Sequence, residues 1–100
     1  MLHTVNKSPF SNRTLSNCLA HLTDGAAVLL IEDGVCGAAA GTAAAAEIAR
    51  YIGRFPVYVL GPDLEARGIR GAGLMAGVKT VDYEGFVRLV TEHEVVQSWL

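Results

Sequence analysis

Six consecutive apolar residues, Ala26 to Ile31, constrain the fold of this chain more than any other feature. A half-buried strand alternates apolar and polar side chains, because successive side chains point to opposite faces of a sheet. A short run without alternation is typical of a strand covered on both faces, as in a parallel sheet. Pro56 to Leu60 has the same character and ends at Gly61-Pro62-Asp63. We therefore expect both runs to lie in the centre of a mainly parallel sheet.

Three other segments are rich in strand-forming residues: Leu2 to Asn6, Val78 to Val81 and Val95 to Leu100. Helical stretches and short turns separate the strands, and this alternation implies a parallel sheet with helices on both faces. A chain of 100 residues is long enough for one domain and too short for two. The sequence predicts a single α/β domain over residues 1–100, with three layers and a mainly parallel sheet.

Apolar residues recur with helical spacing in two stretches. One predicted helix begins at Arg13, and four residues share its apolar face: Leu15, Cys18, Leu19 and Leu22. The other covers Tyr83 to Glu92, with Asp82 as its N-cap. A short helix is expected from Leu64 to Arg67, before a glycine-rich loop, which we expect to be mobile.

The stretch from Val35 to Ile52 is rich in alanine but contains glycines. Alanine favours helix and glycine weakens it, so we expect a helix that breaks near Gly41-Thr42. The spacing of Gly34, Gly37 and Gly41 fits neither the dinucleotide-binding motif nor the phosphate-binding P-loop. Close packing of a small-residue segment explains these glycines better than nucleotide binding.

The charge pattern gives no support for nucleic-acid binding. The net charge is −2, and Lys7 and Lys79 are the only lysines, so no basic stripe exists for phosphates. Val35 to Ala46 is about half the roughly 20 residues that a membrane-spanning helix needs, and no signal peptide is evident. We expect a cytoplasmic chain with no membrane contact. Its apolar fraction of 51% also suggests a surface covered by a partner.

The acidic pair Glu32-Asp33 follows the run of six apolar residues. Open α/β sheets place their sites at the carboxyl ends of strands, so the pair could serve a small-molecule enzyme or a metal. Adjacent strand residues point to opposite faces, however, and a solvated turn explains the pair equally well.

The chain has two cysteines, Cys18 and Cys36, without the spacing of a zinc site or a redox motif. We therefore expect no metal, no cofactor and no disulfide. His21 lies one helical turn after Cys18, and Arg13 lies near the start of the helix, so either could favour a thiolate. Buried cysteines are more often inert apolar residues.

Five blocks resemble the DsrH/TusB family, in the same order and over the whole length: Leu2 to Phe10, Leu29 to Val35, Val57 to Gly68, Val81 to Val87 and Val96 to Leu100. The resemblance implies a small flavodoxin-like fold of DsrE type. It also implies a cytoplasmic sulfur-relay heterohexamer with DsrE/TusD-like and DsrF/TusC-like subunits. That complex passes persulfide sulfur to a DsrC/TusE-like carrier, for sulfur oxidation or for thiolation of the wobble uridine of tRNA.

The segment Leu15 to Leu19 is similar to DsrH, where a cysteine occupies this helix. The resemblance thus favours the DsrH branch and makes Cys18 the candidate sulfur-carrying thiol, although the family's principal cysteine lies on the DsrE/TusD-like subunit. Cys36 and the alanine-rich residues Ala38 to Ala46 depart from the family pattern. The chain is either a subunit with a secondary sulfur site or a purely structural one. Alone, it is expected to form homo-oligomers.

Overall fold

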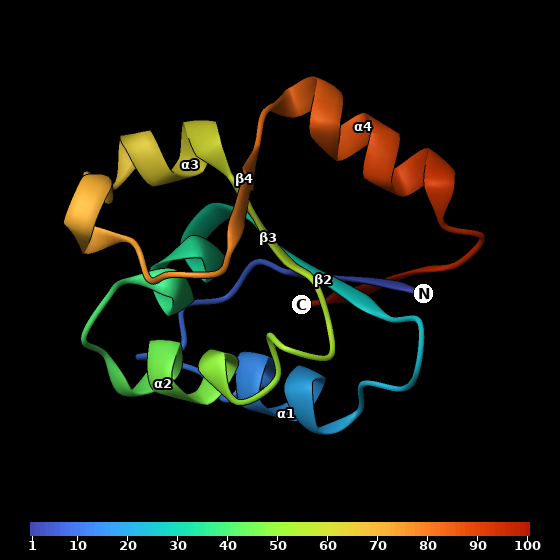
Figure 1. The fold of residues 1–100 in the computed structure, drawn as a ribbon, viewed down its shortest axis with the longest axis horizontal. Coiled ribbons are helices and arrows are strands. Elements are labelled where there is room, and N and C mark those ends of the chain that lie inside the picture. Colours follow the sequence, from blue (N-terminus) through green and yellow to red (C-terminus); the bar gives the residue numbers. More distant parts are fainter.

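All five strands run parallel in one sheet in the computed structural model, which describes residues 1–100 (Figure 1). The strands are β1 (Leu2–Val5), β2 (Ala27–Leu30), β3 (Val57–Leu60), β4 (Lys79–Val81) and β5 (Val96–Trp99), in the order β4-β3-β2-β1-β5. The two apolar runs are interior strands, as expected. Flavodoxin has the order 2-1-3-4-5; here the edge place beside β1 belongs to β5, the last strand.

Helices cover both faces of the sheet, which confirms the three-layer prediction (Figure 1). The helices α1 (Thr14–Ala20) and α2 (Ala43–Ala49) lie on one face, and α4 (Tyr83–Glu92) lies on the other. The short helix α3 (Gly61–Ala66) continues from β3 beyond the carboxyl ends of the strands. None of the helices combines the length and apolar character that crossing a membrane requires.

The sheet divides the interior into two cores of unequal size. On the α1–α2 face, twelve buried residues form one cluster, to which β2 contributes Val28 and Leu30. On the α4 face only four residues are buried together, among them Ala27 and Leu29 of β2. The strand faces alternate between the two cores, so the unbroken apolar run of β2 is explained by burial on both sides.

The predicted helix break at Gly41-Thr42 is confirmed, because the Thr42 hydroxyl caps α2 by accepting a hydrogen bond from the Ala45 N–H at 3.2 Å. The segment before the break is a 3₁₀-helix, η1 (Glu32–Ala38), and begins three residues earlier than the sequence indicated. A Cβ on Gly34 would lie 2.1 Å from the Val5 carbonyl oxygen. This glycine therefore serves close packing, as expected.

The helix α3 starts at Gly61 and not at Leu64, as the sequence had suggested. Pro62 suits the first turn of a helix, where its missing N–H has no partner to lose. The glycine-rich loop that follows is tied down by backbone hydrogen bonds: the Met75 N–H donates to the Ala38 oxygen and the Ala40 N–H to the Gly73 oxygen, both at 2.9 Å. This loop also contains a 3₁₀ turn, η2 (Gly71–Gly73).

Candidate functional site

Cys18, the predicted sulfur-carrying residue, lies inside the larger core. It is 0% exposed, and Leu15 and Leu19 of α1 belong to the same cluster. Burial raises the pKa of the Cys18 thiol to about 12. At neutral pH the group is therefore a protonated, apolar packing residue, because a thiolate loses its hydration in such a site.

The expected help from His21 and Arg13 is absent from Cys18. Burial is the one cause of its pKa shift, which runs opposite to what a nearby cation would produce. The His21 ring points elsewhere, with Nδ1 2.7 Å from the Asn17 oxygen and its centroid 5.7 Å from that of Trp99. The possibility that His21 or Arg13 favours a thiolate therefore finds no support in these contacts.

Cys36 has the more open position of the two thiols. It is half-buried in η1, which follows β2 at the carboxyl edge of the sheet. The pKa of Arg67 is raised chiefly by its hydrogen bonds to Asp33, and Cys36 adds a smaller favourable charge interaction.

The acidic pair is part of the structural framework of this edge. Arg67 donates to Asp33 Oδ1 from Nε at 3.0 Å and from a terminal nitrogen at 2.9 Å. The Glu32 N–H donates to Asp63 Oδ2 at 2.6 Å, and Glu32 has a φ of 49° in the left-handed region. Glu32 and Asp33 open a 3₁₀-helix, so the expected alternation of strand side chains does not apply to them.

These contacts engage the Asp33 carboxylate and the backbone of Glu32. No group of three or more His, Cys, Asp or Glu side chains is placed to hold a metal. Neither Glu32 nor Asp33 lines the two cavities that lie beside α4. Asp63 was not predicted as a partner of this edge, although Asp63 follows β3 just as Asp33 follows β2, and parallel strands bring such positions to one edge.

A second polar cluster ties the two ends of the chain together. The Trp99 indole N–H donates to His3 Nδ1 at 2.9 Å. An indole can only donate, so the His3 ring must be neutral to accept this bond. Burial lowers the pKa of His3, and the charges of the amino terminus and of His21 lower it further.

A cavity of about 780 Å³ opens between α3 and α4 at the carboxyl ends of β3 and β4. It forms because the chain turns to different faces after these two strands. After β3 it enters α3, whose Leu64 belongs to the larger core, whereas after β4 it enters α4 on the opposite face of the sheet. Such a change of side creates the crevice in which open α/β sheets bind ligands. Its lining includes Leu64, Ile69, Arg70, Val81 and Arg88.

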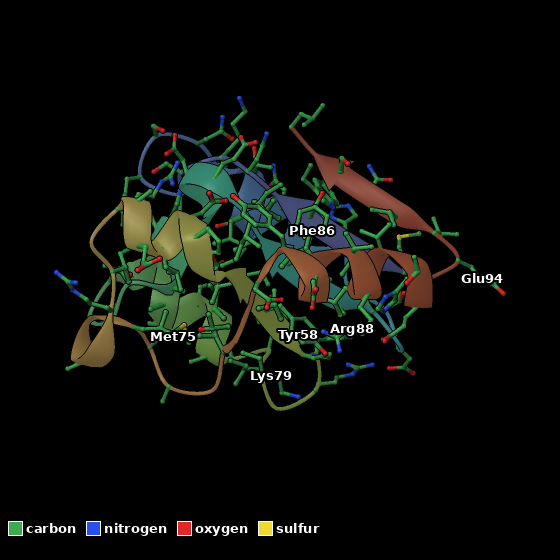
Figure 2. The ribbon with its side chains drawn as sticks, turned by 90° about the horizontal axis from the view of Figure 1, so that it is seen from above. Tyr58, Met75, Lys79, Phe86, Arg88 and Glu94 are labelled. Atoms are coloured by element: carbon green, nitrogen blue, oxygen red, sulfur yellow. The ribbon has the colours of Figure 1, made fainter.

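The cavity is equipped for binding and not for covalent chemistry. Arg70 and Arg88 line it, and neither forms an ion pair. A smaller cavity next to it, lined by Arg88 and Tyr58, lies under α4 (Figure 2). No cysteine or histidine lines either cavity, so neither offers a nucleophile of the kind that sulfur transfer needs.

Comparisons with known proteins identify the family of this chain. The family model described as "DsrH like protein" matches residues 7–96. The chain is 37% identical to Protein TusB of Pectobacterium parmentieri over 101 residues and 34% identical to Protein TusB of Shigella flexneri over 104 residues. Each alignment covers 99% of this chain and 100% of the relative.

Two solved structures share the fold at low sequence identity. The crystal structure of the ychN protein from E. coli has a TM-score of 0.82 and 18% identity, with 97% of each chain covered. The structure of MTH1491, a protein of unknown function from Methanobacterium thermoautotrophicum, has a TM-score of 0.71 and 19% identity, with 97% of this chain and 95% of that one covered. The leaning towards the DsrH branch stays a prediction, since both named sequence relatives are TusB proteins. By its sequence and over nearly its whole length, the chain belongs to the DsrH/TusB family.

Proposed function

We propose that this chain is a cytoplasmic subunit of a sulfur-relay heterohexamer. Its partners in this proposal are DsrE/TusD-like and DsrF/TusC-like subunits, and the complex delivers persulfide sulfur to a DsrC/TusE-like carrier. Membership of the DsrH/TusB family over residues 7–96 supports the assignment. A cavity with two unpaired arginines and no nucleophile is consistent with a subunit that binds partners.

Within that complex we assign the chain a structural role, with sulfur chemistry carried by another subunit. The observation that carries this choice is the state of Cys18, which is 0% exposed and has a pKa raised to about 12. Persulfide transfer requires a thiolate that another sulfur can reach, and Cys18 meets neither condition in the folded chain. A sulfur-carrying Cys18 is the alternative, and it requires the complex to open the α1 core.

The test is a reconstituted complex loaded with a persulfide donor. Peptide mass spectrometry should find added sulfur on the DsrE/TusD-like subunit and none on the peptide containing Cys18. Cys18→Ser and Cys36→Ser should each transfer sulfur to the carrier at the rate of the unmodified complex. A gain of one sulfur atom on Cys18, lost together with transfer in Cys18→Ser, would establish the alternative.

The TusB relatives favour thiolation of the wobble uridine over sulfur oxidation as the pathway. A strain that lacks its own TusB, supplied with this chain, should regain thiolated tRNA. The measurement is the 2-thiouridine content of hydrolysed tRNA, with the empty vector as control. If the chain assembles with the host subunits but thiolation stays absent, the oxidation pathway is the better assignment.

A further inference from the structure

The two edges of the sheet differ in how they are protected. Edge strands expose unpaired N–H and C=O groups, and proteins commonly guard them with charged residues or with very short strands. β4 uses both means: it has three residues, and Lys79 is one of them, its ammonium 5.8 Å from the centre of the Tyr58 ring. β5 uses neither. From Val95 to Leu100 the chain has no charged side chain and no proline.

Exposed apolar side chains gather at the β5 edge. Val95 is 51% exposed, Val96 39% and Leu100 80%, and Met1, which precedes the neighbouring strand β1, is 48% exposed. Figure 2 shows β5 at the outer rim of the molecule, next to the turn that carries Glu94. An uncharged, apolar edge of this kind is a template for pairing with another strand.

The register of β5 against β1 identifies which of its backbone groups are free. β1 and β5 are parallel, with Leu2 opposite Val96, and the Leu2 N–H donates to the Val95 oxygen at 2.9 Å. Alternate residues of a parallel strand bond to the same neighbour, so residues 95, 97 and 99 bond to β1. The N–H and C=O groups of Val96, Ser98 and Leu100 therefore point away from the sheet.

We propose that two copies of this chain pair their β5 strands antiparallel, with the twofold axis at Ser98. This register places Ser98 opposite Ser98 and Val96 opposite Leu100, and all three residues present free backbone groups. Gln97 then lies opposite Trp99. A twofold axis perpendicular to the sheet keeps each side chain on its own face, so the apolar Val96 meets the apolar Leu100, and the two five-stranded sheets become one sheet of ten strands.

A second copy is the occupant that the edge fits best. Self-pairing in this register brings no like charges together, because residues 95–100 carry no charged side chain. The proposal concerns the chain on its own and holds whether or not the sulfur-relay assignment is correct. The contact is small, so we expect association in the micromolar range.

The test measures the mass of the full-length chain in solution by sedimentation equilibrium. The unmodified chain should sediment as a dimer above its dissociation constant. Ser98→Pro removes the outward N–H at the twofold axis, which its own sheet does not use, and edge strands tolerate such a proline. We expect it to weaken dimerisation more than tenfold, by about 1.4 kcal/mol or more.

A second pair of variants separates loss of pairing from loss of fold. Val96→Lys places a charge on the edge and should also give a monomer, with an unchanged far-ultraviolet circular dichroism spectrum as the sign that the fold is intact. Val87→Lys is the matched control, since Val87 is 62% exposed on α4, and it should leave the dimer intact. A monomer at all concentrations up to about 1 mM would overturn the proposal and leave the β5 edge to a different chain. A dimer that survives both edge substitutions, or that only Val87→Lys disrupts, would overturn it as well.

Discussion

The two faces of the sheet are built from the same strands but hold very different amounts of packing. The α1–α2 face holds a cluster of twelve buried residues, and two helices and a 3₁₀-helix cover it. The opposite face holds four, with α4 as its cover. Tyr83 and Val87 of α4 remain 62% exposed. The α1–α2 face therefore supplies most of the stability, whereas the α4 face keeps apolar surface available for contacts outside the chain.

The largest predicted effect is the difference in thiol reactivity between Cys18, in the larger core, and Cys36, at the carboxyl edge of the sheet. A pKa of about 12 leaves Cys18 with roughly a thousandfold less thiolate at pH 7 than an unperturbed cysteine. Half-buried Cys36 should therefore be alkylated by iodoacetamide first, and Cys18 only when the chain unfolds. Mass spectrometry of peptides taken at intervals follows both sites. Labelling of Cys18 at the rate of Cys36 would show that the α1 core opens readily.

Matched leucine truncations compare the packing of the two faces directly. Leu19→Ala on α1 should lower the free energy of unfolding by about 4 kcal/mol, and Leu89→Ala on α4 by about 2 kcal/mol, because a cavity costs most where neighbours are dense. Leu19 is 1% exposed and Leu89 is 7% exposed. Urea denaturation followed by Trp99 fluorescence gives both values. An equal or larger loss for Leu89→Ala would contradict the inequality of the two cores.

Acid should weaken the side-chain contact between β1 and β5 on the α1–α2 face, where Trp99 bonds to His3. It should leave the contact between Thr4 and Ser98 on the α4 face unchanged. His3 must be neutral to accept the Trp99 bond, and its folded pKa lies below the unfolded value of about 6.5. The stability it contributes is therefore complete above pH 6.5 and is lost as pH falls through the folded pKa. The bond contributes about 1–2 kcal/mol.

Two variants check this pH dependence. His3→Phe should be less stable at pH 8 and should lose the part of the acid sensitivity that His3 causes as pH falls below about 6.5. Thr4→Val is the control on the other face, where Thr4 makes only a long 3.4 Å hydrogen bond to Ser98. It should keep the pH dependence of the unmodified chain. An unchanged pH profile in His3→Phe would show that this group does not link stability to pH.

The two helix caps give the smallest predicted effect. Thr42 caps α2, and Asp82 caps α4 by accepting from the Gly85 N–H at 2.8 Å. Replacing either by alanine should cost about 1 kcal/mol. Hydrogen exchange should distinguish them, because α4 has fewer tertiary contacts to hold it. Asp82→Ala should speed exchange along α4 alone, whereas Thr42→Ala should act only through global unfolding.

Much of the fold was predictable because it rests on local patterns. The apolar run before Glu32 identified an interior strand, and Tyr83–Glu92 was predicted with its bounds and its Asp82 cap. The start of η1 was not predictable, since it depends on Gly34 meeting the backbone of Val5, 29 positions earlier in the chain.

Less of the candidate site than of the fold could be predicted from the sequence. Helical spacing correctly placed His21 one turn after Cys18, but spacing does not report which way a ring turns, and this one faces Trp99. The ion pair of Asp33 and Arg67 joins residues 34 positions apart. The pattern that placed Cys18 on an apolar face was the better guide to its chemistry, because the depth of burial sets its pKa.

The pairing of β1 with β5 has a consequence for the order in which the chain folds. Leu2 lies opposite Val96, so β1, the first of these five strands to be synthesised, gains its outer neighbour only after β5, the last of the five. No hairpin shortens this wait, because every strand pair is parallel and needs a crossover. Until β5 pairs with it, β1 exposes unpaired backbone N–H and C=O groups along one side, and nascent chains are vulnerable to aggregation in that interval. The hydrogen bond between Trp99 and His3 forms when β5 pairs with β1. The fluorescence of the single tryptophan of this chain would therefore report this final step of folding.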